Sequence, residues 1–569
     1  MYSAEISIKK SFAGRHVFLA GGTGFLGKVW LAMALERLEG IGRIYVLVRP
    51  GAQLSSQQRF ENLINTSPVF KRLHERFGPQ LSRHISQRVE VLEGDLAEPN
   101  LGLSQNTANR LQRNLDLAIN CAGQVDFNPD IRKALASNVD TTMQLLRFLQ
   151  RCDRASFLHV STCYVAGNRQ GRIDEVLNSN PLPLQQGFDP ELELANARAA
   201  SREISQSQDS AEVQEKLSAA LEKLVERRPN NGNGDRSRFI KSYSRRWLRE
   251  YLRREMIEEG KRRANRWGWQ NTYTYSKGIA EALLSGQARD IRYTIVRPSI
   301  IESSFDYPFP GWNQGFNASA PLAYLLGTWF HLLPAKRDVP FDVVPVDMVC
   351  RALSVIGAAL MLNRHAPVYH IGTSDRNRFT LGRACELTDL GHRRYLREKG
   401  KTTLERVLLS RWDAKLVDAD HLFSTRNLRR AVVEMSDLIE DFPRLIRKRS
   451  VRLTHRLNKA EKQLREIQDL LEVYQPFIHD NFQIFCCRAI DSHPPLEPEF
   501  RFAPELIDWR KYWIEVHMPG LRRWVFPQFE GRSRELFHSD HPVSLTNGEE
   551  LSPAVGNQKQ RVLFARAEN

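Results

Sequence analysis

Short apolar runs alternate with helix-length amphipathic stretches through the first half of the chain. Apolar runs of about four to eight residues are typical of strands buried in a parallel sheet, and the stretches between them are long enough for the crossover helices that such a sheet requires. The pattern predicts an α/β fold: a doubly wound parallel sheet of the Rossmann type. The predicted strands span residues 16–20, 43–49, 88–95, 115–121, 156–162 and 292–299.

A glycine-rich turn joins the first predicted strand to a segment with helical apolar spacing at 28–35. Strand, glycine turn and helix in this order form the phosphate-binding end of a dinucleotide-binding unit. We expect Gly21 to allow the tight turn, Gly24 to let backbone N–H groups approach a pyrophosphate, and Gly27 to let the helix pack close to the strand. An ordinary turn is the alternative. The cofactor contacts expected here are Gly21, Thr23, Gly24, Phe25, Leu26 and Gly27.

The end of the second predicted strand carries a basic residue where many NAD-dependent enzymes carry an acidic one. Arg49 stands at this position, and Arg59 lies on the helix predicted to follow. A guanidinium group can hold the 2′-phosphate of NADP in a charge-assisted, bidentate contact. The pattern therefore favours NADPH as the cofactor. Alternatively, both arginines are solvated surface residues.

The second strong motif is the pair Tyr273 and Lys277, which a helix places on one face because they are four residues apart. Tyr-x-x-x-Lys is common by itself, but here it follows a glycine turn and a strand that ends in Thr162. We expect Lys277 to hold the nicotinamide ribose and to lower the pKa of Tyr273, so that this phenol serves as an acid near neutral pH. Tyr275, between them, is expected to be a packing residue.

The Gly-x-x-Gly-x-x-Gly spacing resembles the extended branch of the short-chain dehydrogenase/reductase superfamily. This resemblance implies that Asp95, followed by Leu96, contacts the adenine, and that Thr162 donates a hydrogen bond to the substrate carbonyl. Strand-end capping is the alternative role of Thr162. After the sixth predicted strand, the backbone from Pro298 to Ile300 is expected to approach the nicotinamide.

Two more residues near these motifs are Asn138, which we assign a structural role, and Cys163, which we do not assign a catalytic role. Asn138 is expected to tie its helix to the active-site strand. Cys163 follows Thr162 directly and suggests a nucleophile. We reject that role because no histidine base is placed beside Cys163 in the sequence and a reduction needs no covalent step.

Residues from about 190 to 265 depart from the strand–helix alternation. A charged, helix-prone segment leads to a turn or link at 229–235, and a strongly basic amphipathic stretch follows. This stretch is either a helix on an anionic membrane or against CoA phosphates, or a helix packed on the domain with a solvated basic face. Its apolar positions are Phe239, Ile240, Tyr243, Trp247, Leu248, Tyr251, Leu252 and Met256, among Arg245, Arg246, Arg249, Arg253 and Arg254.

The chain has 569 residues, of which 41% are hydrophobic, with a formal net charge of +16 and seven cysteines. This length suggests about two to four domains. The cysteines show neither zinc-ligand spacing nor a disulfide framework, which favours a reducing cytoplasm and gives no candidate metal site. The apolar runs are too short for a membrane span, and the longest, 352–362, is expected to be a buried helix. The charge favours anionic partners, and no nucleic-acid motif is present, so we expect phosphorylated small molecules or the inner face of a membrane.

Three longer stretches of the sequence resemble one particular family of reductases. Residues 268–281, 302–312 and 342–347 resemble the alcohol-forming fatty acyl-CoA reductases, which are the male-sterility-type reductases. The resemblance covers residues 14 to about 376 apart from the insertion, and it resumes weakly at 471–477 and 507–521. It implies that NADPH reduces a long-chain acyl-CoA to the alcohol through a fatty aldehyde, with Thr162, Tyr273 and Lys277 as the catalytic residues. It also implies that helices near the C-terminus roof an acyl-chain tunnel.

These observations predict three regions. Residues 1–376 form the NADP-binding reductase domain with its insertion, 377–530 form a mostly helical domain, and 531–569 form a polar, disordered tail. Residues 380–473 are expected to be helical, with an apolar packing stripe on one long helix. The alternatives are a thioester reductase that stops at the aldehyde, a sugar-nucleotide epimerase, and a non-catalytic NADP-binding scaffold on a membrane. No oligomeric state is predicted.

Overall fold

The computed structural model describes residues 5–177, 187–226, 236–328, 330, 332–399, 414–417, 427, 429–430, 432–433, 447–479, 481–532 and 537–545. Its centre is a seven-stranded sheet in the order β11-β7-β5-β4-β1-β2-β3, with every pairing parallel. The chain begins in the middle of the sheet at β1, moves outward to β3, then returns beside β1 and moves outward the other way. This order is the doubly wound Rossmann arrangement and confirms the predicted fold class.

The predicted strands are all present, and a seventh strand, β11, was not predicted. Strand β1 has the predicted bounds, whereas the others end earlier because their last polar residues already belong to the loops. The sheet contains β1 (His16–Ala20), β2 (Arg43–Val48), β3 (Val89–Glu93), β4 (Leu117–Asn120), β5 (Ser156–Val160), β7 (Tyr293–Pro298) and β11 (Val368–Ile371).

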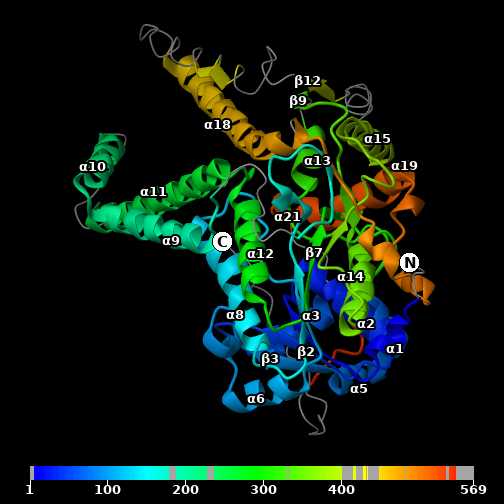
Figure 1. Cartoon of the computed structure of the whole chain (residues 1–569). Helices are drawn as coiled ribbons and strands as arrows, with labels where there is room; N and C mark the ends of the chain where they lie inside the picture. The colour runs from blue at the N-terminus through cyan, green and yellow to red at the C-terminus, as the bar shows by residue number, and fades with distance from the viewer. Residues whose placement is uncertain are drawn as a thin grey trace, which may run out of the picture.

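Both faces of the sheet are buried under helices. Along β1, Val17 and Leu19 belong to one hydrophobic core, and Phe18 and Ala20 belong to a second core on the opposite face, as the two-residue period of a strand requires. The first core is covered by α1 (Ile8–Phe12), α2 (Phe25–Arg37), α3 (Ser56–Thr66), α4 (Lys71–Phe77), α5 (Leu81–Arg88) and α14 (Val346–Met361). The second is covered by α6 (Gln105–Asn114), α7 (Ile131–Ala134), α8 (Thr141–Leu149) and α12 (Thr272–Gln287) (Figure 1).

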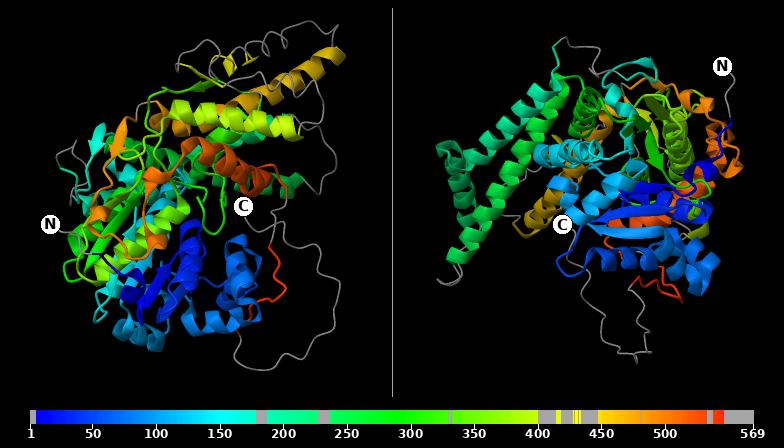
Figure 2. Two further views of the ribbon diagram at one scale, coloured as in Figure 1. Left: turned by 90° about the vertical axis from the view of Figure 1, so that its right-hand side faces the viewer. Right: turned by 60° about the horizontal axis from the view of Figure 1, so that its bottom comes forward.

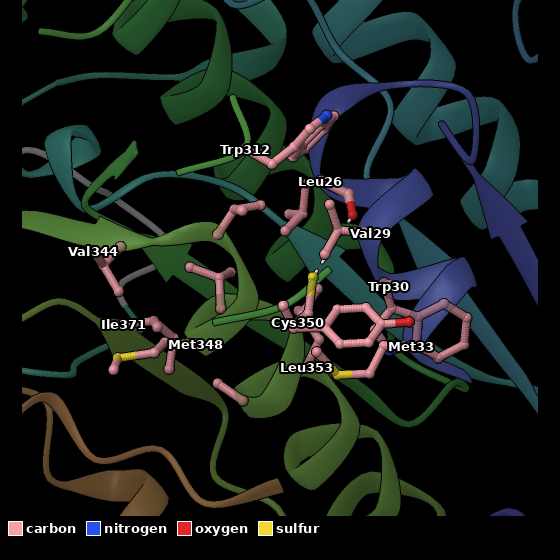
Figure 3. Close-up of a cluster of buried hydrophobic side chains, with 14 of the residues drawn as sticks. Leu26, Val29, Trp30, Met33, Trp312, Val344, Met348, Cys350, Leu353 and Ile371 are labelled. Carbon is pink, nitrogen blue, oxygen red and sulfur yellow. Dashed lines mark hydrogen bonds between the residues drawn. The ribbon is translucent and has the colours of Figure 1, made fainter. Parts of the chain in front are cut away.

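Helices α2 and α14 pack against each other under the sheet (Figure 3). The indole Nε1 of Trp30 donates a 3.2 Å hydrogen bond to Ser354, and the thiol of Cys350 donates to the Leu26 carbonyl at 3.7 Å. The buried helix expected at 352–362 is therefore confirmed as part of α14. In the described part of the chain, no helix is long and apolar enough to cross a membrane.

The inserted segment forms a helical arm that projects from the body (Figures 1 and 2). It consists of α9 (Pro190–Gln206), α10 (Ala211–Glu226) and α11 (Arg236–Arg266), so the predicted basic helix is confirmed. Trp247 stacks on Tyr251 at 5.3 Å between ring centroids, and Lys216 of α10 lies over the Tyr251 ring. Most apolar positions of α11 are half-buried or buried against the arm, although Phe239 is exposed. The arginines from Arg245 to Arg254 are exposed, whereas Arg263 is buried. The predicted link at 229–235 lies outside the described residues.

Of the segment 380–473, which was expected to be helical, residues 400–413 and most of 418–446 lie outside the described residues. The long helices of the C-terminal region are α15 (Leu381–Lys399) and α18 (Arg447–Ile478), and the stripe residues Leu464 and Leu471 of α18 are buried. However, β12 (Lys415–Val417) falls inside the segment expected to be helical, because it pairs with β9 (Leu332–Pro334). Further short elements are α13 (Ala320–Leu326), β6 (Gly171–Ile173), β8 (Ile300–Glu302), β10 (Val343–Pro345), β13 (Gln483–Phe485), α19 (Trp509–Lys511), α20 (Met518–Gly520) and α21 (Phe526–Phe529).

The C-terminal region shares its core with the nucleotide-binding fold. Strand β13 pairs with β6, and the carboxylate of Glu497 accepts hydrogen bonds from Ser7 and from the backbone N–H of Ile8 at the start of α1. Side chains from before and after residue 376 belong to the same buried cluster. The domain boundaries at 376 and 530 stay predictions.

Part of the tail that we expected to be disordered has a defined position. Residues 537–545 lie along α3 and α4, where Asn65 exchanges two hydrogen bonds with the backbone of Val543 at 2.7 and 2.9 Å. The side chain of Val543 is buried, and the N–H of Leu545 donates to Glu61. The expectation of disorder is wrong for this stretch because these hydrogen bonds and this apolar contact fix it.

Candidate active site

The glycine turn lies between β1 and the first residue of α2. Gly21 has a φ of +77°, a conformation that glycine adopts without strain, and a Cβ at Gly27 would lie 2.2 Å from the carbonyl oxygen of Gly21. Only glycine at both positions lets the helix start directly against the turn. Gly24 is the N-cap of α2 and offers no side chain to its first N–H groups. These N–H groups and the helix dipole form a site suited to an anion, with Thr23 exposed beside it.

The loop after β4 links this turn to the Tyr-x-x-x-Lys helix. A Cβ on Gly21 would lie 2.7 Å from the backbone N of Ala122, and a Cβ on Gly123 would lie 3.2 Å from Nζ of Lys277. The two predicted motifs, which are about 250 residues apart, therefore contact opposite ends of one short loop. A side chain at Gly21 or at Gly123 would therefore crowd its neighbours at the two ends of this loop.

Thr162, Tyr273 and Lys277 come together at the carboxyl end of β5. Thr162 accepts a 3.3 Å hydrogen bond from the backbone N–H of Tyr164, so it caps the turn after the strand, and its hydroxyl also hydrogen bonds with the phenol of Tyr273. The Lys277 ammonium donates to the Val160 carbonyl at 3.0 Å. The capping role of Thr162 is confirmed, and its donation to a substrate carbonyl stays a prediction.

The expected lowering of the Tyr273 pKa by Lys277 is wrong. Burial raises the pKa of the Tyr273 phenol to about 12, and the hydrogen bond with Thr162 acts against this rise. Burial lowers the pKa of Lys277 to about 8, against the attraction of Glu281 and Cys121. Removal from water disfavours the charged form of each group, so desolvation dominates. The phenol is therefore protonated at neutral pH.

Arg49, Arg59 and Asp95 meet at the ends of β2 and β3. Arg59 donates a hydrogen bond to the carbonyl of Arg49, and the Arg49 guanidinium lies 4.0 Å from the Asp95 carboxylate. The Arg49 side chain is 72% exposed. An exposed guanidinium beside an anchored second arginine has the geometry to receive a phosphate group. Asp95 also accepts from the backbone N–H of Ala97 at 3.0 Å, and Leu96 is buried next to it.

The remaining predicted cofactor contacts lie around the first turn of α2 and after β7. The Phe25 ring stacks on Trp312 at 5.1 Å between centroids, and Leu26 is buried beside it (Figure 3). Pro298 ends β7, and Ile300 begins β8 with its N–H donating to the Asp342 carbonyl. The predicted residues thus surround the carboxyl edge of the sheet, where ligands bind in doubly wound folds.

Comparison with known proteins agrees with this arrangement. The NAD-binding family described as male sterility protein matches residues 19–353. The chain belongs to this family. The range matched by the male sterility family includes the glycine turn, Thr162 and the Tyr-x-x-x-Lys helix. The match confirms the family resemblance seen in the sequence and shows that this chain binds a nicotinamide dinucleotide.

Relatives of this male sterility family protein match over most of its length. Fatty acyl-CoA reductase 2, chloroplastic, of Arabidopsis thaliana is 27% identical over 90% of this chain and 78% of its own. The alcohol-forming fatty acyl-CoA reductase of Simmondsia chinensis is 27% identical over 90% of this chain and 98% of its own. A solved structure, the terminal R domain of the myxalamid PKS-NRPS pathway, is 17% identical with a TM-score of 0.48, over 90% of this chain and 91% of that one.

Asn138 and Tyr275 hold the active-site helix of this family member in place through contacts that were not predicted from the sequence. Asn138 donates a 2.8 Å hydrogen bond to Ser276 of α12 and accepts from the N–H of Gln124, so it joins α12 to the loop after β4 and not to the strand. Tyr275 is no mere packing residue, because its hydroxyl donates to Glu193 of the inserted arm at 2.6 Å. Such contacts between distant segments carry no local sequence signal.

An aromatic cluster beside the site was also missed. The backbone N–H of Tyr273 donates to the carbonyl of Phe127, whose ring stacks on Phe477 at 5.3 Å and contacts Tyr474 edge-on. Phe477 also contacts Tyr164, two residues after Thr162. The end of α18 therefore lies over the loops that carry the candidate catalytic residues. This cluster joins α18 to two segments that are far away in the sequence, so no local pattern indicated it.

The thiol of Cys163 is buried and donates a 2.8 Å hydrogen bond to the carbonyl of Arg297. Burial raises the pKa of this thiol well above its usual range. A protonated thiol that is already bonded to a carbonyl is a poor nucleophile, which agrees with the rejection of Cys163 as a catalytic group.

Proposed function

We propose that this chain reduces long-chain fatty acyl-CoA to the fatty alcohol through the aldehyde, with NADPH as reductant, and releases CoA. Membership of the male sterility family and relatives named fatty acyl-CoA reductase, one of them alcohol-forming, support this function. The observation that carries it is the contact between the Thr162 hydroxyl and the Tyr273 phenol, with Lys277 touching the loop that contacts the glycine turn. Two hydroxyl groups at this edge of the sheet suit the reduction of a carbonyl.

The residues present fit a phosphorylated dinucleotide. The uncapped N-terminus of α2 suits the pyrophosphate, and Arg49 with Arg59 suits a 2′-phosphate. Asp95 and Leu96 are assigned to the adenine, Lys277 to the nicotinamide ribose, and the backbone from Pro298 to Ile300 to the nicotinamide. When bound, the reduced cofactor supplies hydride.

Thr162 and Tyr273 act on the substrate carbonyl in this proposal. Both hydroxyls donate hydrogen bonds to its oxygen, and one such donor is worth roughly 3–4 kcal/mol of transition-state stabilisation in a dry site. Tyr273 gives its proton to the oxyanion. Since the pKa of Tyr273 is about 12, the phenol holds this proton at neutral pH. Lys277 is charged below pH 8 and stabilises the phenolate that forms.

The overall conversion balances as two reductions. The first adds one hydride and one proton to the thioester, after which the C–S bond breaks and CoA leaves as the thiol, giving the aldehyde. The second adds another hydride and another proton and gives the alcohol. The aromatic cluster of Phe127, Tyr164, Tyr474 and Phe477 is an apolar surface against which the acyl chain can lie beside the carbonyl. Helix α18 then forms part of the predicted roof.

One assay tests the proposal and its rivals. Purified protein is incubated with NADPH and palmitoyl-CoA, and the extracted products are identified while free thiol is measured. Two NADPH consumed per thiol, with hexadecanol as product, supports the proposal. One NADPH per thiol with aldehyde alone would make the protein an aldehyde-forming thioester reductase. Absence of turnover together with intact NADPH binding would favour a non-catalytic scaffold.

We also propose that the protein binds the cytoplasmic surface of an anionic membrane through the exposed basic face of α11. Arg245, Arg246 and Arg249 are exposed on the arm, and each basic residue near an anionic surface contributes about 1 kcal/mol to binding. Co-sedimentation with vesicles containing phosphatidylserine tests it. Charge reversal of the three arginines should release the protein, and unchanged sedimentation would remove this part of the proposal.

A further inference from the structure

A basic cavity of about 790 Å³ lies between α15 and the helical turns that begin at α19. One wall carries Arg393, Arg394 and Arg397, and the other carries Arg510 and Lys511. Figure 1 shows α15 and α19 at the right of the molecule and α12 towards the left, so this cavity is separate from the site described above. Nothing in the proposed reductase function assigns a role to it.

The two walls are held at a fixed separation. The buried indole of Trp513 donates a 2.9 Å hydrogen bond to Thr388 of α15, and a Cβ on Gly391 would lie 3.0 Å from the Met518 side chain. The walls come from segments more than 100 residues apart, and Leu390 and Ile514 give the cavity an apolar part. Most basic side chains of the two walls are exposed, but the buried contacts beneath them hold the walls opposite each other, which favours binding of an anion.

The carboxylates in the cavity are already engaged, and they do not neutralise it. Arg394 lies 3.2 Å from Glu398 and 3.7 Å from Glu515, and Asp508 caps α19 by accepting from the N–H of Lys511. Within the described residues, no carboxylate lies within 4 Å of the charged groups of Arg397, Arg510 or Lys511. Three cations therefore face a common space without a counterion from the described protein.

We propose that this cavity binds a small organic diphosphate or polyphosphate. Guanidinium groups match phosphate oxygens in bidentate geometry, and a compact ligand with two or more phosphates can reach both walls at once. A volume of about 790 Å³ is in the range of small-molecule sites, and its concave form suits a soluble ligand better than a flat membrane. The phosphates can belong to free pyrophosphate or to a phosphorylated adenosine such as that of CoA; the second case rests on the proposed function, whose substrate carries this group.

The test is equilibrium binding of pyrophosphate and of adenosine 3′,5′-bisphosphate to the full chain by calorimetry, with and without saturating NADP⁺. The double variant Arg397→Glu with Arg510→Glu should weaken binding at least about tenfold, since hydrogen bonds to charged groups are lost. The control Arg83→Glu with Arg113→Glu changes the net charge equally at exposed positions on α5 and α6 and should stay within about twofold of the unmodified protein. NADP⁺ should leave the affinity unchanged.

Tighter binding of the bisphosphate than of pyrophosphate would assign the cavity to a phosphorylated adenosine, and equal binding would assign it to the phosphates alone; both support the proposal. Absence of binding at millimolar ligand, equal losses in the two double variants, or competition by NADP⁺ would overturn it. Binding only to anionic vesicles, and not to either soluble phosphate, would also overturn it and make the surface a membrane contact.

Discussion

The hydroxyl of Tyr275 donates a 2.6 Å hydrogen bond to Oε1 of Glu193, although 82 residues separate the two in the chain. Tyr275 lies on α12 between Tyr273 and Lys277, and Glu193 lies at the start of the inserted arm. The same carboxylate accepts a 2.8 Å hydrogen bond from Arg263 of α11, which also pairs with Glu259. The inserted arm is therefore attached to the back of the helix that carries the candidate catalytic residues.

Breaking this attachment should lower stability. Tyr275→Phe removes one buried hydrogen bond and should cost roughly 1–3 kcal/mol of unfolding free energy. Arg263→Met leaves the buried Glu193 carboxylate without its cation, whereas Glu259 keeps its ion pair with Arg262, and the variant should cost about 3–5 kcal/mol. Differential scanning fluorimetry measures both, with Tyr243→Phe on the half-buried face of α11 as a control that should change little. Equal melting temperatures for all three variants would contradict a structural role of this ion-pair network.

Tyr273→Phe should keep NADPH binding and reduce kcat by about 10²–10³-fold, since the variant lacks the proton and one hydrogen-bond donor. Thr162→Val should reduce kcat as well, because Thr162 hydrogen bonds with the same phenol. The rate of NADPH oxidation with palmitoyl-CoA measures the loss, and fluorescence titration measures cofactor binding. Full activity of Tyr273→Phe would refute its assignment as the acid.

Arg49→Asp should weaken NADPH binding by roughly 10–100-fold and leave NADH binding nearly unchanged, since charge-assisted hydrogen bonds to the 2′-phosphate are lost. Arg59→Ala should give a smaller loss in the same direction, because Arg59 anchors the Arg49 backbone. Dissociation constants for both nucleotides provide the measurement, with Arg113→Asp as an exposed control. A loss of equal size for NADPH and NADH would remove the 2′-phosphate role.

NADPH binding should depend on pH through Lys277. The pKa of Lys277 is lowered to about 8, so the side chain is charged below pH 8 and loses its charge above it. The affinity for the anionic cofactor should therefore be constant up to neutral pH and fall as the pH rises through about 8, and catalysis should fall with it. In Lys277→Met the affinity should be lower and without this step. A titration from pH 6.5 to 9.5 gives the comparison, and an identical step in the variant would assign it to another group.

Gly27→Ala should abolish nucleotide binding, since the new Cβ would lie 2.2 Å from the Gly21 carbonyl oxygen and would move α2 away from the turn. Gly286→Ala is the matched control, because Gly286 lies in α12 and a Cβ at this position would have open space within 4 Å. It should stabilise the helix by up to about 1 kcal/mol. Calorimetric binding of NADP⁺ distinguishes the two, and normal binding by Gly27→Ala would show that the turn is not the phosphate site.

The order and type of the elements could be predicted from the sequence because they depend on local periodicity. Buried runs such as 16–20 predicted strands, and glycines three residues apart predicted the turn that Gly21 and Gly27 form. Tyr273 and Lys277 were placed together by helical spacing alone. Strands β11 and β12 were missed because the formation of a short strand depends on the strand with which it pairs.

By itself, the sequence determined the doubly wound fold, the nucleotide turn and the pair of hydroxyls at its edge, since each depends on residue type and on spacing within one element. Only the tertiary structure decided how these groups behave. Burial raises the pKa of Tyr273, although the charge of Lys277 predicted a lower value. The Tyr275 hydroxyl donates a hydrogen bond to Glu193 in the inserted arm, and residues 537–545 pack along α3 and α4. Desolvation and contacts between distant segments have no local pattern, because they exist only once the chain has folded.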